Sequence, residues 1–342
     1  MSSGTPSTRP VLYWLLTGCV MIALMVMIGG ITRLTNSGLS MVEWDLFMGA
    51  IPPMNEVDWQ ETFKKYQAYP EYQMINPDMT LEGFKSIFFW EFLHRQWGRF
   101  MGLVFIIPFL IFWKQGRIQG KLLKRCFVIL IGGAAVGGLG WFMVVSGLKD
   151  RPDVSHYRLA IHLIAAFSLF GLVLWTALDL SRGTLRSPGR KVSKLALWTL
   201  VLVYVQIVYG AFVAGLDAGS IYNTWPLMNG SLMPENVFSL SPFWVNVLEH
   251  KDGVQFIHRN LALIVLGMAL WVAARGLKGN SVRTSRASTM LLGIVVIQFA
   301  LGVATLLLHV PVSLGVAHQL GALFLLAGMF NWLHAERIIQ ST

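Results

Sequence analysis

The chain alternates long apolar stretches with short polar segments. Windows of about 20 mostly apolar residues, the length that crosses the hydrocarbon core of a bilayer as an α-helix, recur eight times. They cover 11–31, 93–113, 123–146, 157–180, 194–216, 254–275, 287–308 and 313–334. Because each window is long enough to cross a membrane once, the pattern predicts an all-α integral membrane protein with eight transmembrane helices.

The composition supports this interpretation. Of the 342 residues, 55% are hydrophobic and only 13% are charged, which is not the composition of a soluble domain. The net charge of +10 raises the alternative of a nucleic-acid-binding protein, but the basic residues have no soluble domain to carry them. We therefore expect the lipid bilayer, and no nucleic acid, as a partner.

The distribution of charge predicts the orientation of the helices. The two termini and three short loops, at 114–125, 181–194 and 275–286, hold 16 of the 27 Lys and Arg residues. In contrast, 15 of the 17 acidic residues lie in the other loops or at adjoining helix ends. By the positive-inside rule, both termini and these three loops are cytoplasmic. The first ten residues resemble neither a signal peptide nor a transit peptide, so we expect a multi-pass protein of the bacterial cytoplasmic (inner) membrane.

An internal repeat organises the chain. Sliding 29–53 onto 210–234 without a gap matches Gly29/Gly210, Gly38/Gly219, Trp44/Trp225, Leu46/Leu227, Gly49/Gly230 and Pro53/Pro234. Each half has four predicted helices and begins inside. The sequence therefore predicts two pseudo-symmetric four-helix bundles, at 11–180 and 194–334, related by an axis along the membrane normal.

Four histidines occupy repeat-related positions near the outer starts of their helices. They are His94 and His162 in the first half and His258 and His318 in the second. Since all four helices run from outside to inside, the imidazoles are expected at one depth, towards the outer face. A neutral imidazole is a good axial ligand for haem iron, and facing helices can hold a cofactor between them. The pairs His94/His162 and His258/His318 are thus two candidate bis-histidine haem sites.

The neighbours of these histidines refine the hypothesis. A single membrane histidine often serves only as a hydrogen-bonding core residue, but four at matching positions argue against that role for the set. Candidate contacts for haem propionates are Arg95, Arg99, Arg158 and Arg259. The remaining histidines, expected to be solvated or interfacial, are His156, His250, His309 and His334.

The two halves differ at one polar segment. Glu91, His94 and Arg95 open the predicted helix 93–113 with charges that are costly in lipid unless they serve a function. The repeat places Gln255 opposite Glu91, so only the first half has an acid one helical turn from its histidine. An acid beside iron can move protons. We therefore expect the reacting site in the first half and a stable cofactor site in the second.

The outer loop 34–90 also belongs to the first half alone. It is the longest polar segment, and it carries aromatic side chains such as Trp59, Phe63 and Tyr66. These would let the loop fold over the membrane face as a lid. A docking surface is an equally good interpretation of the same residues.

Ordered motifs extend along nearly the whole chain. They are Gly29-Gly30-x-Thr32-Arg33-Leu34-Thr35-x-Ser37-Gly38-Leu39-Ser40, Glu91-x-x-His94-Arg95-x-x-Gly98-Arg99, Gly140-Trp141-x-Met143-Val144-x-Ser146-Gly147-Leu148, Arg158-Leu159-x-x-His162-Leu163 and Val213-Ala214-Gly215-Leu216-Asp217-Ala218-Gly219. In this order and spacing the chain resembles the haem A synthase family, in the class found in mitochondria and many Gram-negative bacteria. The outer-loop cysteine pair of the Gram-positive class is absent, since Cys19 and Cys126 fall within predicted helices.

The resemblance implies an activity and a role for each histidine pair. The family oxidises the C8 methyl group of haem O to a formyl group by successive hydroxylations, giving haem A for terminal oxidases. Carried over by position, the implied roles are haem b ligation by His258 and His318, binding of substrate haem O between His94 and His162, and acid catalysis by Glu91. The implied partners are a haem O synthase, an electron donor and a second copy of the chain.

Two other classes of function compete with this interpretation. A dihaem b-type membrane electron-transfer protein would also need paired histidines, but haems that carry electrons across a bilayer are better placed at two depths than at one. A haem carrier without catalysis is the third class. The acid Glu91, with no counterpart in the second half, favours an enzyme over both.

Overall fold

The computed structural model describes residues 7–43, 48–147, 154–185 and 192–339. Eight of its helices are long and apolar enough to span a membrane. These are α1 (Arg9–Leu34), α4 (Leu81–Lys114), α5 (Gly120–Gly147), α6 (His156–Ser181), α7 (Lys194–Gly215), α9 (Lys251–Leu277), α10 (Val282–Leu307) and α11 (Val312–Ile339). The described residues form no strand, so the all-α prediction with eight transmembrane helices is confirmed. Trp44, Leu46 and Leu148 of the motifs and repeat lie outside the described residues.

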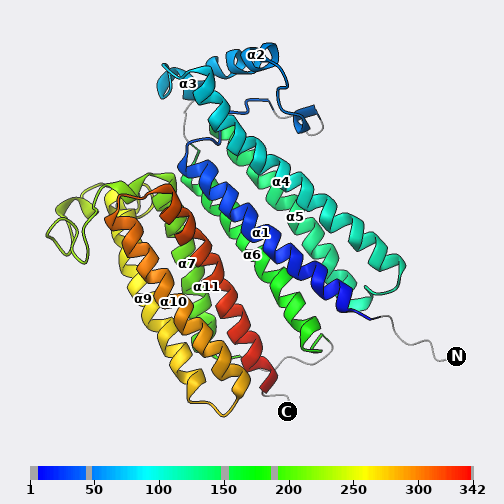
Figure 1. Cartoon of the computed structure of the whole chain (residues 1–342). Helices are drawn as coiled ribbons and strands as arrows, with labels where there is room; N and C mark the ends of the chain where they lie inside the picture. Colours follow the sequence, from blue (N-terminus) through cyan, green and yellow to red (C-terminus); the bar gives the residue numbers. More distant parts are fainter. Residues whose placement is uncertain (1–6, 44–47, 148–153, 186–191, 340–342) are drawn as a thin grey trace.

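Short helices lie in two of the connections between the long helices. The connection from α1 to α4 contains η1 (Met48–Ala50), α2 (Glu56–Gln67) and α3 (Pro70–Met74), and the connection from α7 to α9 contains η2 (Ala218–Ser220), η3 (Glu235–Phe238) and α8 (Phe243–Leu248). Asn55 caps α2 by accepting the Asp58 N–H at 2.9 Å. The aromatic side chains of α2 then pack on Phe84 and Phe88 of α4, so this part of loop 34–90 folds onto the outer end of α4 (Figure 1).

Helix α4 begins earlier than the apolar pattern predicts. Its first residue is Leu81, ten residues before Glu91, so the prediction that Glu91 opens the helix is wrong. Thr80 caps the true start by accepting the Gly83 N–H at 3.3 Å, and the packing of Phe84 and Phe88 against α2 stabilises the extra turns. Glu91 therefore lies within a continuous helix whose first turns pack against α2.

The helices gather in two groups in chain order (Figure 1). Neighbours α1, α4, α5 and α6 contact one another, as do α7, α9, α10 and α11. Helices α1 and α6 also contact α11, and α6 contacts α7, and a single apolar core runs through residues of both groups. The groups are not equally tight, because α4 and α5 touch at few positions whereas the equivalent α9 and α10 pack along each other.

Polar contacts join the two groups of helices at the C-terminal ends of α1 and α7. Arg33 donates to the Ala214 carbonyl at 2.7 Å and to the Asp217 carboxylate at 3.1 Å. Asp217 is mostly exposed, so the charge pair itself contributes little in water. The contact therefore depends mainly on the hydrogen bond from Arg33 to the Ala214 carbonyl.

A second set of polar contacts lies near the C-terminal ends of α6 and α11. Asp179 is fully buried and contacts Arg125 at 2.6 Å and His334 Nε2 at 2.9 Å. Arg182 donates to Nδ1 of His334 at 2.7 Å, so Nε2 must carry the proton that His334 donates to Asp179. The His334 side chain is fully buried, so the prediction that it is solvated or interfacial is wrong. It pairs with a buried carboxylate, which requires buried partners.

Candidate functional site

Each of the four predicted histidines faces a glycine on a neighbouring helix. A Cβ built on that glycine would approach the imidazole closely, so the ring occupies the space that a side chain would fill. The pairs and their closest approaches are Gly29 and His94 at 3.0 Å, Gly140 and His162 at 3.1 Å, Gly210 and His258 at 3.3 Å, and Gly302 and His318 at 2.8 Å. One histidine–glycine arrangement thus occurs four times, twice in each half.

The second-half rings face each other closely. The centroids of His258 and His318 lie 6.5 Å apart, with the ring planes nearly perpendicular. Metal–imidazole bonds are about 2 Å long, so one metal atom fits between ring nitrogens at this spacing. Nδ1 of His318 is buried without a hydrogen-bond partner. These two residues therefore suit axial ligation of a haem iron.

The first half shares one of these features. Nδ1 of His162 is buried without a hydrogen-bond partner, as Nδ1 of His318 is. Across the described parts of the chain, no cluster of three or more His, Cys, Asp or Glu side chains could hold a metal ion. Paired imidazoles without further protein ligands fit a haem, because the macrocycle supplies the other ligands to iron.

Two glutamines that the sequence reading missed contact the second histidine pair. Gln206 on α7 donates to the backbone carbonyl of His258 at 3.1 Å and lies 3.1 Å from its Nδ1. Gln298 on α10 donates to the backbone carbonyl of His318 at 3.0 Å. The signal was present in the sequence as Gln-x-x-x-Gly, which ends at Gly210 and again at Gly302.

Glu91 joins Ser40 and Met41 to α4 through hydrogen bonds. Its side chain is only 3% exposed, and Oε2 accepts hydrogen bonds from the Ser40 hydroxyl and the Met41 N–H, both at 2.7 Å. Oε1 accepts from Arg95 at 2.5 Å. The repeat-related Gln255 is also buried but is neutral, and it donates to the Tyr222 carbonyl at 3.2 Å. The two halves therefore differ in the charge of a buried side chain, which is a carboxylate in the first half and a neutral amide in the second.

The predicted arginines lie within about one helical turn of the histidines, and two of them bind connecting segments. Arg95 donates to the Met41 carbonyl at 2.9 Å, and the repeat-related Arg259 donates to the Thr224 carbonyl at 2.8 Å. Arg158 donates to the Phe142 carbonyl at 3.1 Å and lies over its ring. Arg99 donates to Gln96 at 2.5 Å.

Polar contacts join the connection between α7 and α9 to the first turn of α9. The Tyr222 hydroxyl donates to Asp252 at 2.5 Å, and this hydrogen bond raises the pKa of Tyr222 to about 12. Asp252 also contacts His250 at 2.9 Å. His250 and His156, at the starts of α9 and α6, are half-buried, and His309, between α10 and α11, is exposed as predicted.

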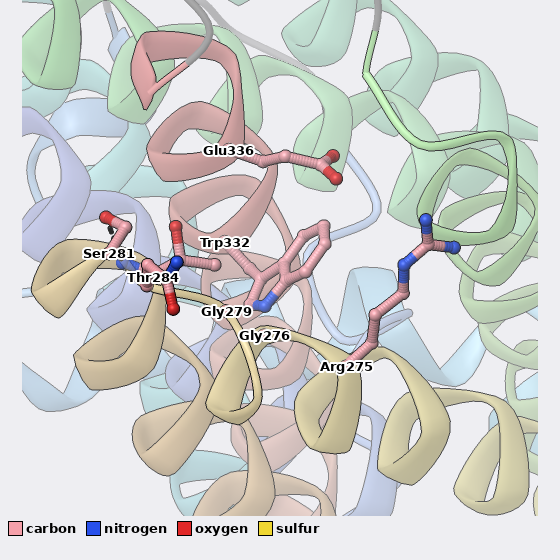
Figure 2. Close-up of a pocket in the computed structure, with 8 residues that line it drawn as sticks. Arg275, Gly276, Gly279, Ser281, Thr284, Trp332 and Glu336 are labelled. Carbon is pink, nitrogen blue, oxygen red and sulfur yellow. Dashed lines mark hydrogen bonds between the residues drawn. The ribbon is translucent and has the colours of Figure 1, made fainter.

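Two hollows among the described residues lie away from the four histidines. Figure 2 shows one of about 280 Å³, where the Trp332 indole lies between Ser281 and Thr284 on one side of the view and Arg275 and Glu336 on the other. Arg275 follows His258 by 17 residues on α9, about 25 Å along a helix. A second hollow, between α6 and α7, is lined mainly by apolar residues. Neither hollow is lined by the four histidines.

The eight long apolar helices define the class of multi-pass membrane proteins. The chain belongs to the cytochrome oxidase assembly protein family, whose sequence model matches residues 12–330. It is 46% identical over 333 residues to a heme A synthase of Flavobacterium psychrophilum, covering 96% of this chain and 98% of the relative.

Two further relatives carry the same name. A heme A synthase of Flavobacterium johnsoniae is 47% identical over 337 residues, covering 95% of this chain and 97% of the relative. One of Paramagnetospirillum magneticum is 46% identical over 334 residues, covering 95% and 93%. The resemblance inferred from the motifs is confirmed, and these names give no support to the electron-transfer alternative. The thiols of Cys19 and Cys126 are both buried and free, as their predicted helical positions require.

Proposed function

We propose that this chain is a haem A synthase, an oxidoreductase of the bacterial membrane that converts the C8 methyl group of haem O to a formyl group. The observation that carries the proposal is the histidine–glycine arrangement, repeated four times in a chain of this family. Successive hydroxylation of one methyl carbon gives a hydrate, and loss of water from it leaves the formyl group. The conversion removes four electrons from the methyl carbon and adds one oxygen atom. With O2 as the oxidant, each hydroxylation inserts one oxygen atom and releases the other as water, and an electron donor supplies two electrons together with two protons.

The two halves, 11–180 and 194–334, take different haems in this proposal. His258 and His318 ligate a resident haem b, which supplies one-electron redox chemistry when bound. Substrate haem O lies between His94 and His162, delivered by a haem O synthase. Two observations support the division, namely the loose contact between α4 and α5 in the first half and the glutamine contacts to both ligands in the second.

The side chains around the first pair bind and orient the substrate. Arg95, Arg99 and Arg158 offer guanidinium groups for the haem propionates, as Arg259 does for haem b. Glu91 holds or moves a proton at its carboxylate oxygens during hydroxylation. The Ser40 hydroxyl and the Met41 N–H hold the Glu91 carboxylate in position.

The decisive test of the proposal is the identity of the haems. The full-length protein is purified from a strain that makes haem O, its pigments are extracted, and the haems are separated by chromatography. We expect haem B together with haem O or haem A. Haem B alone, in an amount of two per chain, would instead identify a dihaem electron-transfer protein.

The orientation has its own test. We propose that both termini are cytoplasmic and that the histidines lie towards the outer side of the inner membrane, because the basic loops are retained inside. A reporter enzyme that is active only outside the cytoplasm should be active when fused after Asp78 and silent when fused after Arg283. The reverse pattern would move all four histidines to the inner side.

A further inference from the structure

The hollow shown in Figure 2 lies where α9 ends, α10 begins and α11 approaches its end. Trp332 forms one wall. Its side chain is 2% exposed, and the indole N–H donates to the Ser288 hydroxyl at 2.9 Å. Gly276 lets the helices meet there, because an added Cβ would lie 2.7 Å from the indole nitrogen. Packed helices therefore form the hollow at one end of three membrane-spanning segments, where lipid headgroups meet a protein.

Hydrogen-bond donors line this hollow. Thr284 is 6% exposed, and its hydroxyl is buried without a hydrogen-bond partner. The first N–H groups of α10 have no carbonyl partners within the helix, and the helix dipole favours an anion at that end. In the described parts of the chain, the exposed Arg275 guanidinium makes no hydrogen bond or ion pair. A phosphate group, which accepts hydrogen bonds and carries negative charge, suits this set of donors.

A carboxylate lines the same hollow. Figure 2 shows Glu336 and Arg275 on the same side of the Trp332 indole. Over the residues that the structure describes, these two side chains form no ion pair with each other. Oε2 of Glu336 accepts the Ser193 N–H at 2.8 Å, which holds the carboxylate in place. A ligand that carries a cation beside a phosphate would therefore meet an opposite charge for each group.

Apolar side chains next to the hollow favour a lipid over a soluble ligand. Trp271 precedes Arg275 by four residues, so both lie on one face of α9, and Trp271 is 61% exposed. Leu277 and Val282, on either side of the turn between α9 and α10, are 44% and 67% exposed. Aromatic side chains near the ends of spanning helices lie at the membrane–water interface. The acyl chains of a lipid whose headgroup occupied the hollow would meet these side chains, whereas a soluble phosphate would not.

We propose that this hollow binds the headgroup of phosphatidylethanolamine. The phosphate accepts hydrogen bonds from the Thr284 hydroxyl and the first N–H groups of α10, and Arg275 neutralises its charge. The primary ammonium donates to Glu336. Phosphatidylcholine has no N–H for this bond and phosphatidylglycerol has no cation, so the carboxylate selects among phospholipids. The site is independent of the haem assignments, because none of the four histidines lines it.

The first test measures which phospholipid the protein retains. Purified full-length protein in detergent is incubated with equal amounts of phosphatidylethanolamine, phosphatidylcholine and phosphatidylglycerol, freed of unbound lipid by gel filtration, and analysed by mass spectrometry. We expect phosphatidylethanolamine to exceed phosphatidylcholine by ~10-fold, the ratio that one hydrogen bond to a charged group provides. Equal retention of the three lipids, or an excess of phosphatidylglycerol, would overturn the inference. Displacement of the lipid by inorganic phosphate alone would also overturn it, because the hollow would then be a plain phosphate site.

The second test assigns the contacts. Arg275→Gln should lower the retention of phosphatidylethanolamine by ~10-fold, and Thr284→Val, which keeps the shape but removes the hydroxyl, should lower it several-fold. Glu336→Gln should instead bring phosphatidylethanolamine and phosphatidylcholine to similar amounts. Arg286→Gln is the matched control, because Arg286 is an exposed arginine of α10 that does not line the hollow, and it should change neither quantity.

The gel-filtration step also shows whether each variant has folded. Thr284→Val and Glu336→Gln are close in shape to the wild type, so the test stays decisive if Arg275→Gln fails to assemble. Wild-type retention in Thr284→Val, or an unchanged lipid preference in Glu336→Gln, would show that these side chains do not bind the headgroup and would overturn the inference.

Discussion

Replacing His318 or His258 with alanine is expected to remove nearly all haem b from the purified protein. Under the proposed assignment each imidazole would supply one of the two protein ligands to the haem iron, and the other imidazole, whose ring centroid lies 6.5 Å away, would not replace it. His94→Ala should instead retain haem b at close to the wild-type amount and form no haem A. The reduced-minus-oxidised difference spectrum measures the first quantity, and chromatography of extracted haems measures the second.

A matched control for these variants is His309→Ala. His309 is exposed in an outer connection, so its loss should affect neither haem b content nor haem A formation. If all four single variants at His94, His162, His258 and His318 lost haem b equally, the division into a substrate site and a cofactor site would be wrong. The histidine–glycine arrangement alone would then describe two equivalent sites.

Glu91→Gln is expected to lower haem A formation by ~10²–10⁴-fold, the usual contribution of general acid–base assistance. Glutamine keeps the shape of the side chain and can still accept from Ser40 and Met41, but it cannot exchange a proton. Haem b content should remain near normal, since Glu91 belongs to the first half. The measurement is haem A formed in a strain that lacks the wild-type protein.

Ser40→Ala separates this proton role from the structural one. It removes one hydrogen bond to Glu91 and leaves the carboxylate in place. A modest effect of Ser40→Ala beside a severe effect of Glu91→Gln would support proton transfer. A normal rate in Glu91→Gln would show that Glu91 serves only to pair with Arg95 and to hold the outer segment.

The apolar pattern was sufficient to predict all eight transmembrane helices, because a bilayer forces each spanning segment to be both helical and apolar. It could not place the start of α4. The residues from Leu81 to Trp90 leave the apolar window, and they become helical through contacts with α2 that are specified elsewhere in the chain. Tertiary packing, not local pattern, determined this boundary.

The repeat singled out the four histidines whose imidazoles each face a glycine on a neighbouring helix, because duplicated positions share a local environment. It gave no hint about His334, whose partner Asp179 lies 155 residues away. Gln206 and Gln298 were missed for a different reason. A single polar residue inside an apolar window does not change the prediction of a helix, and its contact with a histidine on another helix is visible only after folding.

The contact between the first and last helices affects how the protein assembles. Gln319 on α11 donates to the Val26 carbonyl on α1 at 3.2 Å, across 293 residues of sequence. At a synthesis rate of about 5–20 residues per second, roughly 15–60 s separate the two residues on the ribosome. Helix α1 thus enters the bilayer first but completes its packing last. Throughout this interval the face of α1 that α11 will cover is open to lipid and to membrane proteases. A chain truncated before Val312 would leave this face of α1 uncovered permanently, and we expect membrane proteases to degrade it.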